Sequence, residues 1–329
     1  MARKARNPWD ITEATFPSVG TTAEKLRFIV GYAILAPSAR NTQPWRFEVK
    51  DDTVNLYADF SRRLTVADPN MLQLYISLGC ALENLLLAAR HFGFSCSIDY
   101  LPITEDNEVV VKVLCTVAGA SRASTLFRSI PLRHTQHGNY DGRPLTPSVI
   151  EKLNACATDP ALRLLFVQKA PVKAAVAKLL LRADALALAN PAYRQELAES
   201  IGSGNLGQSW LVSQLGQFAL AHLDMEKSIK KRDQDALASS PAFGLISGEK
   251  ATRTFQVKAG QLLQKLNLTA HKLGICMQPV SVLLETAEVN AAFTKLFRAG
   301  GVPLLPFRIG YADEPDHATP RRPLEEVLL

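Results

Sequence analysis

The chain has 329 residues, of which 47% are hydrophobic and 21% are charged. This composition is typical of a soluble globular protein with a substantial core, long enough for one large or two ordinary domains, and it excludes a disordered chain. The net charge of +6 includes Arg3, Lys4 and Arg6 and a cluster at 227–232, which we interpret as solvated surface. Binding of nucleic acid would require a concentrated basic face with a recognisable element that reads the bases, and the sequence shows none. Nucleic acid is therefore not an expected partner.

Five cysteines are widely separated in the sequence, mostly in apolar surroundings: Cys80, Cys96, Cys115, Cys156 and Cys276. We expect them to be reduced core residues, and without a Cys-x-x-Cys or His/Cys cluster we expect no metal site. The N-terminus lacks the apolar core of a secretory signal, and polar residues interrupt the apolar stretch 206–223. No membrane contact is therefore expected, and a cytoplasmic location follows by default.

In chain order, the first helix is predicted at 21–35, where apolar residues recur at helical spacing, and Pro37 ends it. A second helix at 71–92 is too apolar for a surface helix and is expected to be central. The strands of this first set are predicted at 46–50, 53–58, 95–101 and 108–116.

A second set of elements follows. Its helices are expected near 124–130 and 147–156, after Pro171, and at 254–273 and 287–298. Its strands are expected at 163–167, 242–247 and 304–309. Region 190–238 is predicted to be helical but irregular, because glycines interrupt it. The segments 84–93 and 266–274 both end a long apolar helix with a glycine. This parallel indicates an internal duplication.

The loop between the first helix and the first strand is densely polar. Ser38, Asn41, Thr42 and Gln43 offer hydroxyl and amide groups that can match the edge of a heterocycle, and Pro44 is expected to keep the preceding residue extended. The alternative is a helix C-terminal loop whose polar side chains face water.

This loop resembles the flavin-contacting loop of FMN-dependent nitroreductases, which carry the pattern Pro-Ser-x-x-Asn-x-Gln-Pro-Trp. The resemblance implies FMN contacts from Pro37, Ser38, Ala39, Asn41 and Gln43. Members of the family are mostly homodimers with FMN at the subunit interface. Together with the duplication, this implies an α+β nitroreductase-like fold in which two degenerate halves, 1–121 and 122–329, form a single-chain pseudo-dimer around central apolar helices.

Two basic segments resemble the phosphate-binding parts of the family. Arg133, His134 and Thr135 match the segment that binds the FMN phosphate, and Arg321 and Arg322 match the basic C-terminal ending. A guanidinium stays ionised and offers paired donors to a doubly charged phosphate. Surface arginines are the alternative interpretation of either segment taken singly.

A third segment, with Gln278, Pro279 and Val280, stands where the family places a short loop against the flavin N5 edge. A structural turn is the alternative. No catalytic side chain is predicted, because the hydride chemistry belongs to the cofactor.

The fused duplication and the stretch from Arg62 to Pro69 resemble the Acg-type subgroup. The resemblance implies ping-pong hydride transfer from NAD(P)H through FMN to a small electron-poor acceptor, such as a nitro compound or a quinone. The alternative is a silent FMN-sequestering protein in which 190–238, with Trp210, Phe218 and His222, forms a lid; an ordinary helical insertion is equally compatible. A third interpretation is an interaction protein whose site has decayed. A monomeric pseudo-dimer is expected, with further pairing of chains left open.

Overall fold

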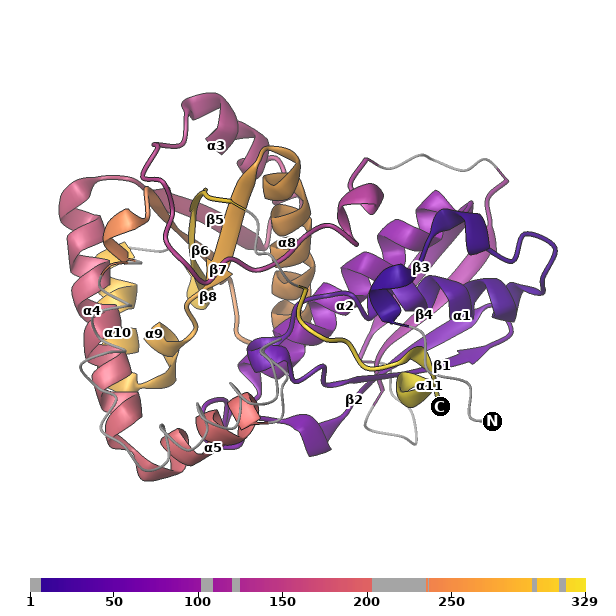
Figure 1. Ribbon diagram of the computed structural model, residues 1–329, viewed down its shortest axis with the longest axis horizontal. Helices are drawn as coiled ribbons and strands as arrows, with labels where there is room; N and C mark the ends of the chain where they lie inside the picture. Colours follow the sequence, from indigo (N-terminus) through magenta and orange to yellow (C-terminus); the bar gives the residue numbers. More distant parts are fainter. Residues whose placement is uncertain are drawn as a thin grey trace.

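The computed structural model describes residues 7–101, 109–119, 125–202, 235, 237–297, 301–313 and 318–329. Figure 1 shows two halves side by side, each made of a sheet and its helices, which meet along two long helices, α2 and α8. The predicted α+β architecture in two halves around central apolar helices is confirmed.

The two halves repeat one order of elements. The first contains α1 (Thr22–Ala33), β1 (Trp45–Lys50), β2 (Thr53–Ala58), α2 (Leu72–His91), β3 (Phe94–Tyr100) and β4 (Val109–Val117). The second contains α3 (Pro147–Asn154), β5 (Leu162–Val167), β6 (Ala242–Gly248), α8 (Arg253–Lys272), β7 (Ile275–Pro279) and β8 (Val302–Tyr311). Both sheets are antiparallel, with the equivalent strand orders β1-β2-β4-β3 and β5-β6-β8-β7.

Local sequence signals set where several of these elements begin. Thr21 and Glu24 form a capping box at α1, in which each side chain accepts a hydrogen bond from the other residue's backbone N–H. Thr146 caps α3, and Pro147 occupies its first turn, where a missing N–H costs nothing. Such signals are local, which explains why the predicted elements agree with the structure to within a few residues.

Helices α2 and α8 cross in direct backbone contact. A Cβ atom added at Gly79 would lie 1.9 Å from the carbonyl oxygen of Val257, and one added at Gly260 would lie 2.0 Å from the carbonyl oxygen of Ile76. The two clashes involve equivalent positions of the two helices. Gly260 lies 181 positions after Gly79, and Val257 lies 181 positions after Ile76. Only glycine allows the two helices to approach this closely.

The glycines that follow the two helices are separated by the same 181 positions. Gly93 follows α2 with φ of 85°, and Gly274, 181 positions later, follows α8 with φ of 67°. Both glycines adopt the left-handed conformation that ends a helix and turns the chain into the next strand. The predicted internal duplication is confirmed.

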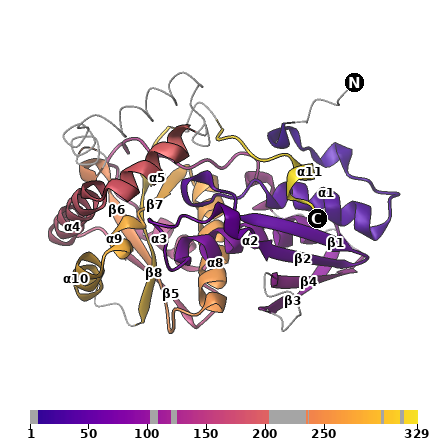
Figure 2. The same ribbon diagram turned by 90° about the horizontal axis from the view of Figure 1, so that it is seen from below.

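Among the described residues, further helices lie between the strands of the second half. They are α4 (Ala170–Ala189), α5 (Pro191–Gly202), α9 (Val282–Glu285) and α10 (Ala287–Phe297). Val176, Leu283 and Phe293 join α4, α9 and α10 in a core cluster of their own. Helix α5 extends away from this cluster toward the first half (Figure 2).

Helix α2 has the length and apolarity of a membrane span, but 89% of its most apolar window is buried inside the protein. Its apolar residues are therefore accounted for by packing between the two halves.

Some predictions need correction. The segment with Gln278 and Pro279 is not a short loop: both residues lie in β7 and pair with Arg308 and Phe307 of β8. Gln43 is not extended before Pro44 but has φ of 50°. The helix expected near 124–130 is a single 3-10 turn, η5 (Phe127–Ser129).

Other predictions fall on parts of the chain that the structure leaves undescribed. The boundary between 121 and 122 lies there and stays a prediction, as do Trp210, Phe218 and His222 of the predicted lid.

Candidate functional site

The loop after α1 is built around a 3-10 turn, η3 (Ala39–Asn41), in an unusual backbone conformation. Arg40, Asn41 and Gln43 have φ of 45°, 54° and 50°, in the left-handed region that favours glycine. Non-glycine residues persist there only where their surroundings fix them, and they concentrate at binding sites. Inside the loop, the Ser38 hydroxyl oxygen accepts a hydrogen bond from the backbone N–H of Gln43 at 2.9 Å.

The C-terminal segment fixes this loop from the other end of the chain. Arg321 donates to the Asn41 side-chain oxygen at 3.0 Å, and the Asn41 amide group donates to the Pro320 carbonyl at 2.8 Å. The Gln43 side-chain oxygen accepts from the Arg322 backbone N–H at 2.8 Å. Figure 1 shows this segment crossing from the second half to end at α11 (Leu324–Val327), beside β1. The predicted loop and the predicted basic ending therefore lie together.

Two arginines of the site are buried without an anionic partner. Arg133 is 2% exposed and Arg321 is 8% exposed. Arg133 donates to the Thr135 hydroxyl at 3.3 Å, and Arg321 donates to uncharged oxygens of Leu35, Asn41, Thr319 and Pro320. The Nε atom of each is buried with no hydrogen-bond partner, and within the described ranges neither guanidinium forms an ion pair with a carboxylate.

These cations influence one another. Burial, together with the charge of Arg133, lowers the pKa of Arg321 to about 9, and burial lowers the pKa of Arg133 to about 10. Burial and then the charges of Arg133 and Arg321 lower the pKa of His134 to about 4. The lowered pKa values mean that the surroundings of all three groups disfavour positive charge. An anion bound among these groups would therefore stabilise the folded protein. We call Arg133, His134 and Arg321 the cationic cluster.

Trp9 completes this cluster and was not predicted. Its ring lies 4.8 Å from the Arg321 guanidinium carbon, and its centroid is 5.1 Å from that of His134. The indole N–H donates to the Thr319 carbonyl at 2.9 Å. Trp9 precedes the part of the chain that resembles the family, so no motif marked it.

Other predicted site residues have protein partners instead. Arg322 lies 3.6 Å from Asp59 and 3.8 Å from Glu326, and donates to the carbonyls of Gln43 and Trp45. Of the two C-terminal arginines, only Arg321 thus joins the cationic cluster.

The predicted site residues in and after β7 also have partners within the protein. The Gln278 side chain is hydrogen-bonded to Arg308 and His137, and Val280 packs in the core cluster of α4, α9 and α10. Pro279 ends the strand paired to β8.

Helix α2 connects the loop with the segment that follows β7. The Ala39 N–H donates to the Ser77 hydroxyl at 3.2 Å, and Ser77 donates to the Gln73 carbonyl at 2.7 Å. The Gln73 side chain accepts from the Ser281 hydroxyl at 3.0 Å and donates to Glu285 at 3.1 Å. Burial raises the pKa of Glu285 to about 7. The charge of Arg40, in the loop, acts in the opposite direction on the pKa of Glu285, so this region also interacts with the loop directly.

Helix α5 contacts the loop from outside. Glu196 lies 3.2 Å from Arg40 and accepts from the Val66 and Ala67 amides at 2.9 and 3.0 Å. The Arg40 guanidinium carbon lies 4.6 Å from the centre of the Tyr193 ring. Beside these contacts, a pocket of about 610 Å³ is lined by α5 and the chain around 61–66 and reaches Thr42.

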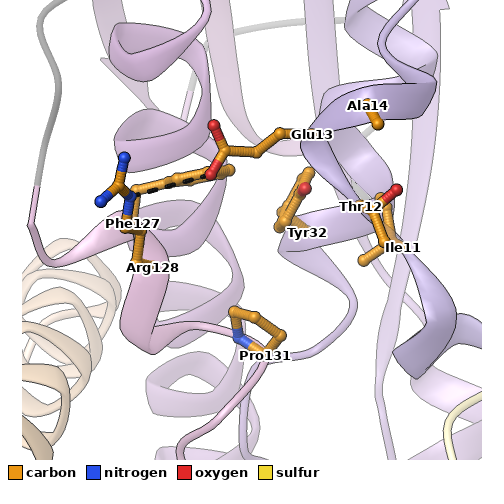
Figure 3. Close-up of a pocket in the computed structure, with 8 residues that line it drawn as sticks. All are labelled: Ile11, Thr12, Glu13, Ala14, Tyr32, Phe127, Arg128 and Pro131. Carbon is orange, nitrogen blue, oxygen red and sulfur yellow. Dashed lines mark ion pairs between the residues drawn. The ribbon is translucent and has the colours of Figure 1, made fainter.

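A second pocket, of about 380 Å³, lies between the N-terminal segment and η5. Figure 3 shows Tyr32 and Phe127 on its walls and the ion pair between Glu13 and Arg128, 3.9 Å apart. Within the ranges that the structure describes, no three His, Cys, Asp or Glu side chains gather as a metal site would require.

No family model matches the chain. "Putative NAD(P)H nitroreductase Rv3131" of Mycobacterium tuberculosis is 27% identical over 93% of this chain and 91% of its own length. "Putative NAD(P)H nitroreductase acg" of the same organism is 24% identical over 95% of this chain and 97% of its own length. Among solved structures, the FMN-dependent nitroreductase NfnB from Mycobacterium smegmatis superposes with a TM-score of 0.40 at 16% identity, over 60% of this chain and 94% of that one.

Proposed function

The chain is a relative of the NAD(P)H nitroreductases, as its motifs predicted, and from this premise we propose that it binds one FMN between its two halves and acts as an NAD(P)H-dependent oxidoreductase. The acceptor is proposed to be a small electron-poor molecule such as a nitro compound or a quinone. We also propose a cytoplasmic location.

One observation supports this most: the cationic cluster contains two buried guanidinium groups that have no ionic partner among the described residues. Each has a buried Nε donor without an acceptor. A phosphate monoester would supply anionic oxygens to both groups and remove the cost of burying their charges. The residues present therefore fit the phosphate of FMN, with Arg133 and Arg321 as its ligands and Trp9 and His134 beside them.

The loop after α1 fits the remainder of the cofactor. The Ser38 oxygen already accepts from Gln43, and its hydroxyl hydrogen has no acceptor among the described residues, so it can donate to a flavin oxygen or nitrogen. The side chains of Asn41 and Gln43 bind the C-terminal segment. We propose that they position the loop and Arg321 rather than recognise the flavin directly.

When bound, FMN supplies the redox chemistry by accepting a hydride from NAD(P)H and returning the reducing equivalents to an acceptor. The chain would hold the phosphate, fix the loop, and admit small molecules through the polar pocket beside Thr42. No side chain is assigned as an acid or a base.

A second candidate function has support from α5. Glu196 and Tyr193 contact Arg40, in the loop proposed to hold the flavin. If the region beginning with α5 excludes nicotinamide, the protein would store FMN without turning it over.

The test is an anaerobic absorbance titration of the FMN-loaded protein with NADH and then NADPH. Bleaching of the bound-flavin band would support the oxidoreductase. A yellow protein that dithionite bleaches but neither nicotinamide does would support storage. Failure of the apoprotein to take up FMN would contradict both and favour an interaction protein with a decayed site.

A further inference from the structure

The fold brings together two cysteines that are far apart in the sequence. Cys96 on β3 and Cys115 on β4 are direct partners in the antiparallel register, and their sulfur atoms lie 3.2 Å apart. Both thiols are free in this structure. The free thiols agree with the expectation of reduced cysteines, whereas Cys96 is half-buried and not the core residue that was expected.

The geometry of the pair suits a disulfide. Directly opposed residues on antiparallel strands have Cβ atoms about 4.5–5.5 Å apart, and a disulfide requires about 3.5–4.5 Å. With the sulfurs already adjacent, small rotations about the Cα–Cβ bonds would bring them to bonding distance. Strand β3 is the outer strand of its sheet, so it has a neighbour on one side only and can shift to accommodate the bond.

The two thiols differ in access. Cys115 is 1% exposed, whereas Cys96 is half-buried and can meet a small oxidant. The hydrogen bond from Cys115, followed by the charge of Arg90, lowers the pKa of Cys96. A thiolate is the form that reacts with peroxides, so Cys96 is placed to react first and Cys115 to resolve the product.

The remaining cysteines make contacts of other kinds. Cys80 donates to the Gly260 carbonyl, Cys156 to Thr269, and Cys276 to the Ala312 carbonyl. Burial raises the pKa of Cys80 to about 12. These contacts make the other three thiols suitable internal controls.

We propose that Cys96 and Cys115 form an oxidisable dithiol site that closes reversibly to a cross-strand disulfide when hydrogen peroxide reaches Cys96. In the first step the Cys96 thiolate attacks a peroxide oxygen, the O–O bond breaks, and hydroxide leaves and is protonated to water. Cys96 becomes a sulfenic acid. In the second step the Cys115 sulfur attacks the Cys96 sulfur, the S–O bond breaks, and a second water leaves. Two thiols are oxidised and one peroxide is reduced to two waters.

The experiment uses the purified full chain, reduced, freed of reductant and exposed to hydrogen peroxide. Free thiols are then alkylated under denaturing conditions, and the intact mass and peptides are analysed. We expect the alkylated cysteines to fall from five to three, a Cys96–Cys115 cross-linked peptide, and recovery of all five after treatment with dithiothreitol. Unchanged labelling, or a disulfide that involves another cysteine, would overturn the proposal.

Variants sharpen the result. Cys276→Ser should still lose two labels, since Cys276 is half-buried like Cys96 but faces Gly310 in the strand register. Cys115→Ser should leave Cys96 as a sulfenic acid that dimedone traps, and Cys96→Ser should protect the buried Cys115. Rapid oxidation of Cys115 in Cys96→Ser would contradict the assigned order of attack. The wild-type peptide map decides the proposal even if a variant folds poorly.

Discussion

The guanidinium of Arg321 donates to the side-chain oxygen of Asn41 at 3.0 Å, which joins the end of the chain to the loop after its first helix. The acceptor is a neutral amide, so the charge of Arg321 is held in place without being neutralised. This relationship suggests a direct test of the anion site.

Asn41→Asp should neutralise that charge from within the protein. A carboxylate at the same position would pair with Arg321 and compete with a phosphate, so we expect FMN affinity to fall by about 1–3 kcal/mol. The apoprotein should become more stable. FMN titration and thermal unfolding measure the two effects. Asn41→Gly retains the left-handed backbone without the carboxylate and serves as the control, and equal behaviour of both variants would remove charge from the explanation.

Arg133→Met should weaken FMN binding and at the same time stabilise the apoprotein. Loss of one partner of a desolvated ionic contact should cost about 2–4 kcal/mol of FMN binding. Because the unpaired buried charge is also removed, the apoprotein should gain roughly 1–3 kcal/mol of unfolding free energy.

Riboflavin, which lacks the phosphate, provides the comparison for Arg133→Met and should bind the variant and the wild type alike. Arg143→Ala is a matched control, since Arg143 is exposed and already pairs with Asp141. An equal loss of riboflavin affinity would place Arg133 near the ring system or in the fold, away from a phosphate.

Glu83→Gln should change the pH dependence of stability. Burial raises the pKa of Glu83 to about 7 from its ordinary value of 4.5, so between these values the folded chain holds a proton that the unfolded chain has released. Stability contributed at this site is therefore lost as pH rises from 4.5 to 7. The variant should match the wild type near pH 4.5 and exceed it above pH 7, by up to about 3 kcal/mol.

Urea unfolding across this pH range measures the Glu83 effect. The Gln261 amide group on α8 donates to Glu83 at 3.4 Å, a bond that a glutamine oxygen can still accept. A constant offset between variant and wild type at all pH values would contradict a titrating Glu83.

Gly79→Ala should force α2 and α8 apart. The added Cβ would lie 1.9 Å from the Val257 carbonyl oxygen, so we expect a loss of about 1–3 kcal/mol or more in unfolding free energy. Gly260→Ala should behave alike, because its clash with Ile76 is the repeat of the first. Gly138→Ala, which would meet only the Gln136 side chain, is the control. Wild-type stability of Gly79→Ala would mean that the helices do not approach this closely.

Glu196→Ala should loosen α5 from the loop. It removes the partner of Arg40 and the acceptor of two backbone amides, so exchange of bound FMN and its reduction by NAD(P)H should both become several-fold faster. Stopped-flow absorbance measures the reduction. Glu288→Ala, which removes an exposed ion pair with Arg182 away from this pocket, should have no effect. Unchanged rates for Glu196→Ala would show that α5 does not control access.

Local order along the chain was predictable from the sequence. Periodicity, capping residues and glycines place α1, α2 and α8 and most strands, since these signals act within a few residues. The repeated apolar helices indicated the duplication, and the polar loop, Arg133 and the basic ending indicated a flavin site, because each motif is contiguous.

What each side chain does was decided by tertiary structure. Arg321 and Arg322 are neighbours in the sequence, yet Arg322 pairs with Asp59 whereas Arg321 is buried with no anionic partner in the described part of the chain. Trp9 joins the cationic cluster from outside any motif, and Cys96 meets Cys115 only because β3 and β4 pair in one register. Burial and charge partners depend on residues brought together by folding, and no local pattern in the chain encodes that proximity.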